Sequence, residues 1–235
     1  MAPNVLADEQ ALYAIAKSYP EAFLFVGYSE KALFESVDGA VEAISPYLQA
    51  AEKRCSGKPF LMVYGGDPAH VPTIGAVVKA LRQKHKCHVL AMQASGKHED
   101  WVDHVFICQE QFEVVKKLVD GKEVEVKETL WGGTRNGVPV GGARYYMGPE
   151  FYGRPADNVP GAITLTFFLG GGGIAAEELQ FADEYGAPWI YIPCPAKNVA
   201  AYGGRFGLVH DYVVKKLSSG EGKHLALFGN RPAQS

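Results

Sequence analysis

The sequence predicts an α/β protein, a doubly wound, Rossmann-like parallel sheet with a β-hairpin or lid insertion. Two observations support this prediction. One pattern occurs three times along the chain, in which an apolar run is followed by glycine and then by a segment of helical periodicity. The apolar runs are continuous, which is typical of strands that helices cover on both faces.

The first two units occupy the N-terminal half of the chain. A strand at 23–26 is followed by a helix with one apolar face, made by Leu33, Val37, Val41 and Ile44. The second unit has a strand at 60–64 and a helix that starts near Pro72, because proline suits the first helical turn. A strand at 87–92 closes this unit.

The third unit lies in the C-terminal half. It comprises a strand at 163–169, a helix at 174–185 and a strand at 189–192, and a last helix is expected at 205–217. In sheets of this kind, ligands bind beyond the carboxyl ends of the strands, where the glycines lie.

The stretch 119–152 departs from the pattern. It alternates apolar and charged residues and then turns through glycine pairs, which predicts one or two hairpins or a long lid. The sequence of this insertion fits a flap over a sheet edge and a lid over a substrate equally well. No linker composition separates a second domain, so 1–235 is expected to be one domain with a disordered tail at about 229–235.

The composition argues against several functional classes. The chain has 23 Lys+Arg against 26 Asp+Glu and a net charge of −3, so it lacks the basic surface that binds nucleic acid. We expect no secretory signal and no membrane-spanning helix, because no apolar stretch is long enough. Four scattered cysteines without a CxxC pair indicate reduced thiols and a cytoplasmic location, namely Cys55, Cys87, Cys108 and Cys194.

We also expect no metal site. His85 and His88 flank the predicted junction between a helix and a strand, so their side chains should point in different directions. Structural zinc usually requires four Cys or His ligands at close spacing, and the chain does not supply them.

The segment "LGGGGIAAEE" at 169–178 is the strongest candidate for a binding site. A strand that ends in glycines and opens a helix presents free backbone N–H groups and the positive end of the helix dipole, which together favour phosphate. The spacing differs from the dinucleotide G-x-G-x-x-G pattern and from a Walker loop. The predicted phosphate-binding residues here are Gly170, Gly171, Gly172, Gly173 and Ile174.

Glycines also follow the first two strands. We expect these turns to complete the ligand site at the same edge of the sheet. The candidate residues are Gly27, Ser29, Gly65, Gly66 and Asp67.

The segment 169–178 resembles the Pro-Gly-Gly-x-Gly-Thr-x-x-Glu signature of the Lonely-Guy family, whose members were long mislabelled as lysine decarboxylases. It also resembles a branch of proteins with the same fold that carry the molybdenum cofactor. "VYGGDPAHVPTIGAVVKAL" is similar to the family's Tyr-Gly-Gly-Gly stretch and the helix after it, and "FVGYSE" to its first Gly-Ser turn. Glu177 falls on the family's catalytic glutamate. Leu169 replaces the signature proline, and Ile174 replaces a threonine that helps to hold phosphate.

The family's second catalytic residue is an arginine fifteen positions before the signature. Counting back from Leu169 gives Arg154, in the segment "FYGRPADN". Pro155 disfavours a helical conformation at Arg154, where the family has a helical arginine.

The resemblance implies a nucleoside 5′-monophosphate N-glycosidase, that is, a phosphoribohydrolase that needs no cofactor and acts as a homodimer or larger assembly. Glu177 would stabilise an oxocarbenium-like centre, while Arg154 or Arg144 would hold phosphate or polarise the leaving base. The alternative is a non-catalytic carrier or sensor of a phosphorylated ligand, such as a nucleotide or the molybdenum cofactor. The lost threonine and the displaced arginine favour the carrier, and the retained Glu177 favours the enzyme. A third reading is that the insertion has rebuilt the pocket for other chemistry.

Each of these candidate residues also fits a simpler, structural role. Glu177 could only compensate the helix dipole, and Arg154 could be a solvated surface residue. Asp67 could accept a ribose hydroxyl or cap a helix. Three aromatic residues in the insertion could stack on a base or form the packing face of a hairpin, namely Trp131, Tyr145 and Tyr146.

Overall fold

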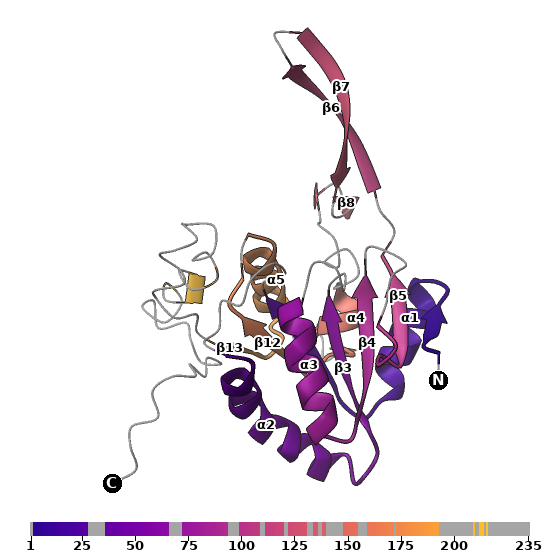
Figure 1. Ribbon diagram of the computed structural model, residues 1–235, viewed down its shortest axis with the longest axis vertical. Coiled ribbons are helices and arrows are strands. Elements are labelled where there is room, and N and C mark those ends of the chain that lie inside the picture. Colours follow the sequence, from indigo (N-terminus) through magenta and orange to yellow (C-terminus); the bar gives the residue numbers. More distant parts are fainter. Residues whose placement is uncertain are drawn as a thin grey trace.

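Strands and helices alternate from β1 to β4 and again from β12 to β13 (Figure 1). The computed structural model describes residues 2–27, 36–65, 72–93, 99–108, 111–119, 122–130, 134–135, 138–139, 148–154, 159–171, 173–192, 209, 212–213 and 215. The helices are α1 Glu9–Ser18, α2 Val37–Arg54, α3 Pro72–Lys84, α4 Pro149–Tyr152 and α5 Gly173–Glu184. The strands of the main sheet are β1 Asn4–Leu6, β2 Ala22–Gly27, β3 Phe60–Gly65, β4 Cys87–Gln93, β5 His104–Ile107, β12 Leu165–Leu169 and β13 Trp189–Ile192. The remaining strands are β6 Gln111–Val119, β7 Lys122–Leu130, β8 Thr134–Arg135, β9 Val138–Pro139, β10 Gly153–Arg154 and β11 Val159–Pro160.

The main sheet has seven strands in the order β1-β5-β4-β3-β2-β12-β13, and every neighbouring pair is parallel. Parallel strands need crossover connections, and helices supply four of them here. This topology confirms the predicted doubly wound, Rossmann-like sheet.

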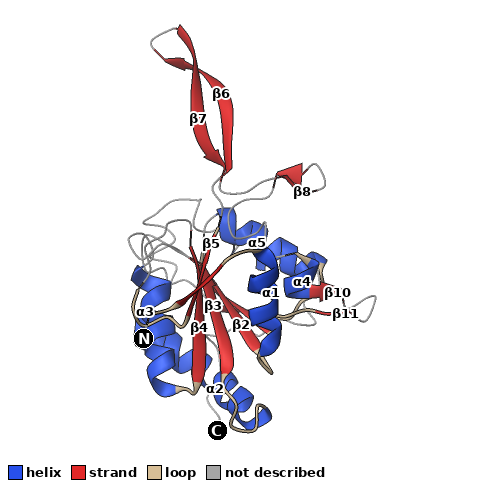
Figure 2. Ribbon diagram, turned by 90° about the vertical axis from the view of Figure 1, so that its right-hand side faces the viewer, coloured by secondary structure: helices blue, strands red, loops and turns tan. Residues whose placement is uncertain are grey.

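Helices cover both faces of the sheet (Figure 2). The pleat sends alternate side chains to opposite sides, so Phe23 and Phe25 of β2 join the core under α2 and α3. Leu24 and Val26 join the core under α1 and α5. Because both faces are buried, these strands lack polar positions, as the continuous apolar runs indicated.

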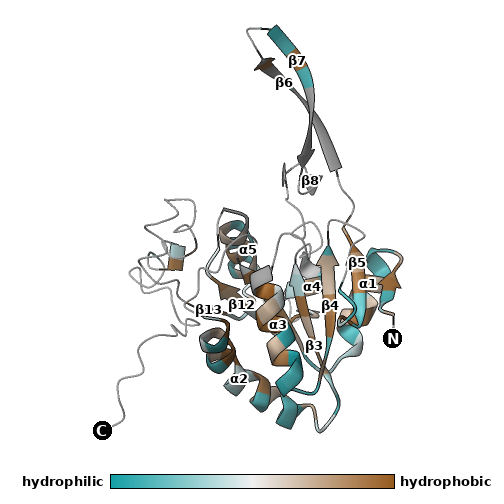
Figure 3. Ribbon diagram, viewed as in Figure 1, coloured by the Kyte–Doolittle hydropathy of each residue, from teal (hydrophilic) through white to brown (hydrophobic). Residues whose placement is uncertain are grey.

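Local sequence explains where the helices begin. Asp8 caps α1 by accepting a hydrogen bond from the Ala11 N–H at 2.8 Å, and Ser36 caps α2 by accepting from the Gly39 N–H at 2.9 Å. Helix α3 begins at Pro72, as predicted. Both α2 and α3 carry hydrophilic and hydrophobic residues, as amphipathic helices do (Figure 3).

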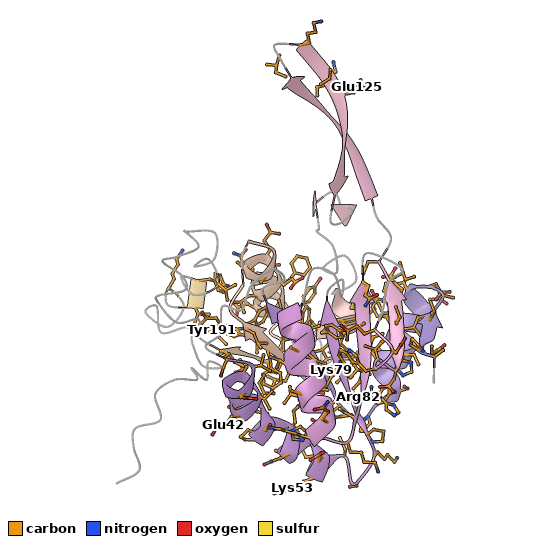
Figure 4. The ribbon with its side chains drawn as sticks, viewed as in Figure 1. Glu42, Lys53, Lys79, Arg82, Glu125 and Tyr191 are labelled. Carbon is orange, nitrogen blue, oxygen red and sulfur yellow. The ribbon has the colours of Figure 1, made fainter. Side chains whose placement is uncertain are left out.

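The predicted hairpin is formed by β6 and β7, which pair antiparallel and project away from the sheet (Figure 1). It begins at Gln111, before the predicted start of the insertion at 119. Lys116 Nζ lies 3.3 Å from Glu123 Oε1 across the two strands. Glu125 lies near the far end of the hairpin, well away from the sheet (Figure 4).

Three elements at one edge of the sheet were not predicted, namely β1, α1 and β5. Strands β1 and β5 are short and pair with each other across about a hundred residues of chain, so neither has a strong local signature. The expected tail at 229–235, and most of the expected helix at 205–217, lie outside the described residues. No described helix is both long enough and apolar enough to cross a membrane.

Candidate functional site

The order of the strands defines a switch point between β2 and β12. From β2 the chain builds outward through β3, β4 and β5, and it then returns to place β12 and β13 on the other side of β2. Loops that leave two adjacent strands in opposite directions open a crevice beyond their carboxyl ends, where ligands bind in doubly wound sheets. Gly27, the last residue of β2, and Gly170, directly after β12, both lie at this edge of the sheet.

Gly27 ends β2 and is paired with Leu169, the last residue of β12. A Cβ at position 27 would lie 2.6 Å from the Leu169 carbonyl oxygen and 3.1 Å from Cδ1 of Ile74, which belongs to α3. Real Cβ atoms do not approach backbone oxygen so closely, so only glycine fits at this position.

The loop after β12 also requires glycine. Gly170 and Gly171 have φ angles of 63° and 131°, a region that L-residues with side chains rarely adopt. A Cβ on Gly171 would lie 2.4 Å from Cβ of Ala175 and 3.2 Å from Cγ2 of Val209. This compact turn feeds directly into α5, which begins at Gly173, close to the predicted start.

Two adjacent glutamates on α5 lie in different environments. The side chain of Glu177, which matches the family's catalytic position, is exposed, whereas Glu178 is only 6% exposed. Glu178 falls on the apolar stripe of α5 together with Ala175, Leu179 and Ala182. The helical period therefore identifies Glu178 as the inward-facing carboxylate, a signal that the sequence prediction did not use.

Glu178 lies near two buried groups. Burial, with a further contribution from the Glu178 carboxylate, raises the pKa of Cys108 to about 12. The same two causes raise the pKa of Tyr152 well above its usual value. Both groups are therefore neutral at physiological pH, and neither is an activated nucleophile or base.

Arg154 lies in β10, where it pairs with Val159 of β11. The extended conformation confirms the expectation that Pro155 disfavours a helix at this position. Glu177 and Arg154 remain predicted catalytic residues. Helix α4, directly before β10, packs into the same core as α5.

At the end of β3, Gly65 has open space around it, since a Cβ there would meet nothing within 4 Å. The other predicted site residues lie outside the described part of the chain or have undescribed side chains. They are Ser29, Gly66, Asp67, Trp131, Arg144, Tyr145, Tyr146, Gly172 and Ile174.

One buried residue at this edge was not predicted. Gln93, the last residue of β4, is 0% exposed, and neither Oε1 nor Nε2 of its amide has a hydrogen-bond partner among the residues that the structure describes. Buried side-chain amides are almost always hydrogen-bonded in native proteins. In the sequence, a single glutamine at the end of an apolar run gave no signal of this kind.

His85 and His88 point in different directions, as expected. His85 faces α2, with Nε2 3.3 Å from Ser45 Oγ, whereas Nδ1 of His88 lies 2.7 Å from the Tyr19 hydroxyl at the end of α1. The described residues contain no group of three or more His, Cys, Asp or Glu side chains placed to hold a metal ion.

Comparison with known proteins gives little beyond the fold. No protein-family model matches the chain, and no curated protein matches it. Among solved structures, it is similar to the Moco carrier protein of Chlamydomonas rheinhardtii, with 10% sequence identity, coverage of 89% of each chain and a TM-score of 0.44. The function therefore has to be inferred from the residues of this chain.

Proposed function

We propose that the protein binds a small phosphorylated ligand at the crevice between β2 and β12 and holds it as a carrier or sensor. The observation that supports this most strongly is the turn after β12, where Gly170 and Gly171 have φ angles of 63° and 131°. The turn lies at the carboxyl end of β12 beside β2, the edge where a doubly wound sheet binds ligands, and it leads directly into α5.

The ligand is proposed to be anionic because α5 begins at this crevice. Its first turn presents N–H groups that lack partners within the helix, and the helix dipole places partial positive charge there. The phosphate is expected to lie against the N–H groups of residues 171–174. The sharp turn at Gly170 and Gly171 supports this position, because glycines let an anion approach the backbone.

A carrier is favoured over an enzyme by the position of Glu177. A carboxylate that stabilises a developing cation is most effective in a site that excludes water, where it needs no reorganisation. Glu177 is exposed instead, and the inward-facing Glu178 lies on the side of Tyr152 and Cys108.

The second candidate is a phosphoribohydrolase that acts on nucleoside 5′-monophosphates. A specific observation keeps it open, since Glu177 occupies the matched position one turn into α5. In that reaction, Glu177 would stabilise the oxocarbenium-like centre, and Arg154 would hold phosphate or polarise the base.

We further propose that the protein is a homodimer in which the β6–β7 hairpin contributes to the interface. An isolated two-stranded hairpin is only marginally stable in water. This hairpin projects from the sheet with Leu118 78% exposed and Val124 39% exposed. Leu118 pairs with Glu123 and Val124 with Lys117, so the two apolar side chains point to opposite faces of the hairpin. A second copy of the chain packed on the Leu118 face would cover Leu118, and two-fold dimers are the commonest oligomers.

A cytoplasmic location remains part of the proposal. Cys55, Cys87 and Cys108 are buried and form no disulfide. Burial raises the pKa of all three thiols, so they stay protonated and unreactive.

A thermal-shift screen tests the proposed function. The panel contains inorganic phosphate, ribose 5-phosphate and nucleoside 5′-monophosphates, and each hit is then incubated and checked for released base. A ligand at 100 times its dissociation constant should add about 2.7 kcal/mol to the free energy of unfolding. We expect stabilisation without product, whereas base release would establish the enzyme, and no stabilisation by any member of the panel would contradict the proposal.

A further inference from the structure

The Tyr19 hydroxyl, directly after the last residue of α1, contacts two histidine rings at once. It lies 2.7 Å from Nδ1 of His88 and 2.9 Å from Nε2 of His104. Both rings also pack edge-to-face against the Tyr19 ring, with centroids 5.6 Å and 6.2 Å away. His88 is the second residue of β4 and His104 the first of β5, so these contacts tie the end of α1 to two neighbouring strands.

The contacts attach the N-terminal unit, β1 with α1, to the amino end of the sheet. The three residues of β1 pair with β5, and the Asn4 N–H donates to the Asp103 carbonyl oxygen at 2.8 Å. Leu12 and Ala16 of α1 are buried in the core. A short edge strand and one helix face give little attachment, and such units open locally more readily than core elements do.

The hydrogen bonds around the hydroxyl fix which ring nitrogens carry hydrogen. The hydroxyl has one hydrogen for two nitrogens, so one imidazole must donate an N–H to its oxygen. Nδ1 of His104 is buried and has no hydrogen-bond partner among the described residues, so a hydrogen there would be an unsatisfied donor. Neutral His104 therefore donates from Nε2 to Tyr19, and the Tyr19 hydroxyl donates to Nδ1 of His88.

An added proton disrupts this arrangement on either ring. On His104 it goes to Nδ1, where no described residue can accept it. On His88 it goes to Nδ1 and displaces the hydrogen that the Tyr19 hydroxyl donates. The centroids of the two imidazoles are 6.3 Å apart, so a charge on one ring also opposes a charge on the other.

The carboxylate that acts on this cluster is already paired. Asp103, directly before His104, accepts hydrogen bonds from Arg82 of α3 and from the Val89 N–H. Burial lowers the pKa of His104, Asp103 opposes this change, and the charge of His88 adds to it. The negative charge of Asp103 therefore does not compensate for the burial of the His104 ring.

The charged groups of α1 do not replace Asp103. Glu9 accepts a hydrogen bond from the Tyr13 hydroxyl within the helix, and Lys17 is exposed. Burial, with a contribution from Asp103, raises the pKa of Tyr19, so its hydroxyl keeps its hydrogen at physiological pH.

We propose that Tyr19, His88 and His104 form an acid-sensitive latch, which holds β1 and α1 on the sheet while both rings are neutral and releases them when a ring is protonated. An imidazole freed by opening has the usual histidine pKa of about 6.5. The closed state binds fewer protons than the open state below this value, so the latch is fully stable above about pH 6.5. It weakens as the pH falls toward the lower pKa of His104 in the closed state.

Hydrogen exchange of the full chain, followed by mass spectrometry, tests the latch. Protection factors of the α1 amides are compared with those of α3 at about pH 7.5 and about pH 5. In the wild type, α1 should lose about 5-fold or more protection relative to α3 on acidification. Tyr19→Phe keeps the ring and removes the hydroxyl. Its α1 should be less protected than the wild type at the higher pH and should lose no more protection than α3 at the lower pH.

Tyr13→Phe is the matched control, because it removes a hydroxyl from the same helix whose hydrogen bond goes to Glu9. It should keep the pH dependence of the wild type. A second variant, His104→Gln, retains an N–H that can reach the Tyr19 hydroxyl but cannot be protonated. Its α1 should lose less protection on acidification than the α1 of the wild type.

Equal loss of protection by α1 and α3 in the wild type would refute the latch. A Tyr19→Phe protein whose α1 keeps the wild-type pH dependence would refute it too. If neither variant folds, NMR titration of the His104 ring in the wild type decides the question. A pKa clearly below about 6.5 supports the latch, and a pKa at or above this value overturns it.

Discussion

Gly27 and Leu169 lie side by side at the ends of two adjacent parallel strands, so close that a Cβ on Gly27 would lie 2.6 Å from the Leu169 carbonyl oxygen. This contact joins the two halves of the doubly wound sheet at the point where the chain changes direction. The geometry of the candidate site therefore depends on a glycine inside the fold as well as on the loops above it.

Gly27→Ala should destabilise the protein. The added methyl group meets backbone on one side and Cδ1 of Ile74 on the other, and backbone cannot move aside as a flexible side chain can. We expect a loss of about 1–3 kcal/mol in the free energy of unfolding, as for other overpacked sites. Chemical denaturation of both proteins measures this loss.

The matched control is Gly65→Ala, at the end of the neighbouring strand. A Cβ there meets nothing within 4 Å, so the stability should change by less than about 1 kcal/mol. If the two variants are equally stable, the close packing of β2 against β12 does not limit the residue at position 27.

The central part of the fold could be predicted from sequence because its strands are buried on both faces. The apolar runs of β2, β3, β4 and β13 have no alternation, and each is bounded by a turn or a glycine. Strands β1 and β5 at the edge are three and four residues long and depend on each other. Long-range pairing of this kind leaves little trace in the local sequence.

The site was predictable to a similar extent. Glycine spacing located the turn at Gly170 and Gly171, where positive φ angles do require glycine. The motif match predicted Glu177 as the functional carboxylate. In the structure, the helical period of α5 leaves Glu177 exposed and makes Glu178 the buried glutamate. Gln93 could not be identified from the sequence, since only the structure shows that its amide is buried without a hydrogen-bond partner among the described residues.

The two adjacent glutamates of α5, Glu177 and Glu178, should differ in how much their substitution changes stability. Glu177→Ala should change the free energy of unfolding by less than about 1 kcal/mol, because the side chain is exposed and water weakens the interactions that it makes. Glu178→Ala should cost about 1–3 kcal/mol, because it removes a buried polar group and leaves its surroundings unsatisfied. Melting of both variants under the same conditions compares them directly.

Glu177→Gln separates the carrier from the enzyme. For a carrier, the wild type releases no base from nucleoside monophosphates, and the variant binds them as tightly as the wild type. For a phosphoribohydrolase, removing one preorganised electrostatic partner should lower turnover by about 100-fold or more with little change in binding. Base release at saturating nucleotide, measured for both proteins, decides between these outcomes.

Leu118→Glu should weaken the proposed dimer. The substitution places a charge at the more exposed of the two apolar hairpin side chains whose exposure the structure describes. A charge buried without a partner in the proposed interface is costly, so the dissociation constant of the dimer should rise by about 10-fold or more. Light scattering over a dilution series measures it. Val5→Glu is the control, since Val5 is 53% exposed but lies on β1. A wild-type protein that is monomeric at all concentrations would exclude the dimer.

The ion pair between Arg82 and Asp103 should make stability depend on pH at the acid end. Nη2 of Arg82 donates to Oδ1 of Asp103 at 2.9 Å, and the Val89 N–H donates to Oδ2 at 2.8 Å (Arg82 is labelled in Figure 4). Burial alone would raise the pKa of Asp103, but the hydrogen bonds and charge of Arg82, with the Val89 N–H, hold this pKa below its usual value. These bonds fix the segment that carries Trp101 against β4.

The pKa of an Asp carboxyl group in the unfolded chain is about 3.9. When the pKa is lower in the folded protein, the group stabilises the fold at pH values above the unfolded pKa. This stabilisation is lost as the pH falls through the folded pKa. The wild type should therefore be more stable than Asp103→Asn by about 1 kcal/mol at pH 6–8, a modest value because both side chains are partly exposed to water. This difference should shrink steadily below about pH 4. Thermal unfolding of both proteins across this range measures it, and a double-mutant cycle with Arg82→Met assigns it to the ion pair. A stability difference that stays constant down to pH 2 would show that Asp103 acts through packing and not through its charge.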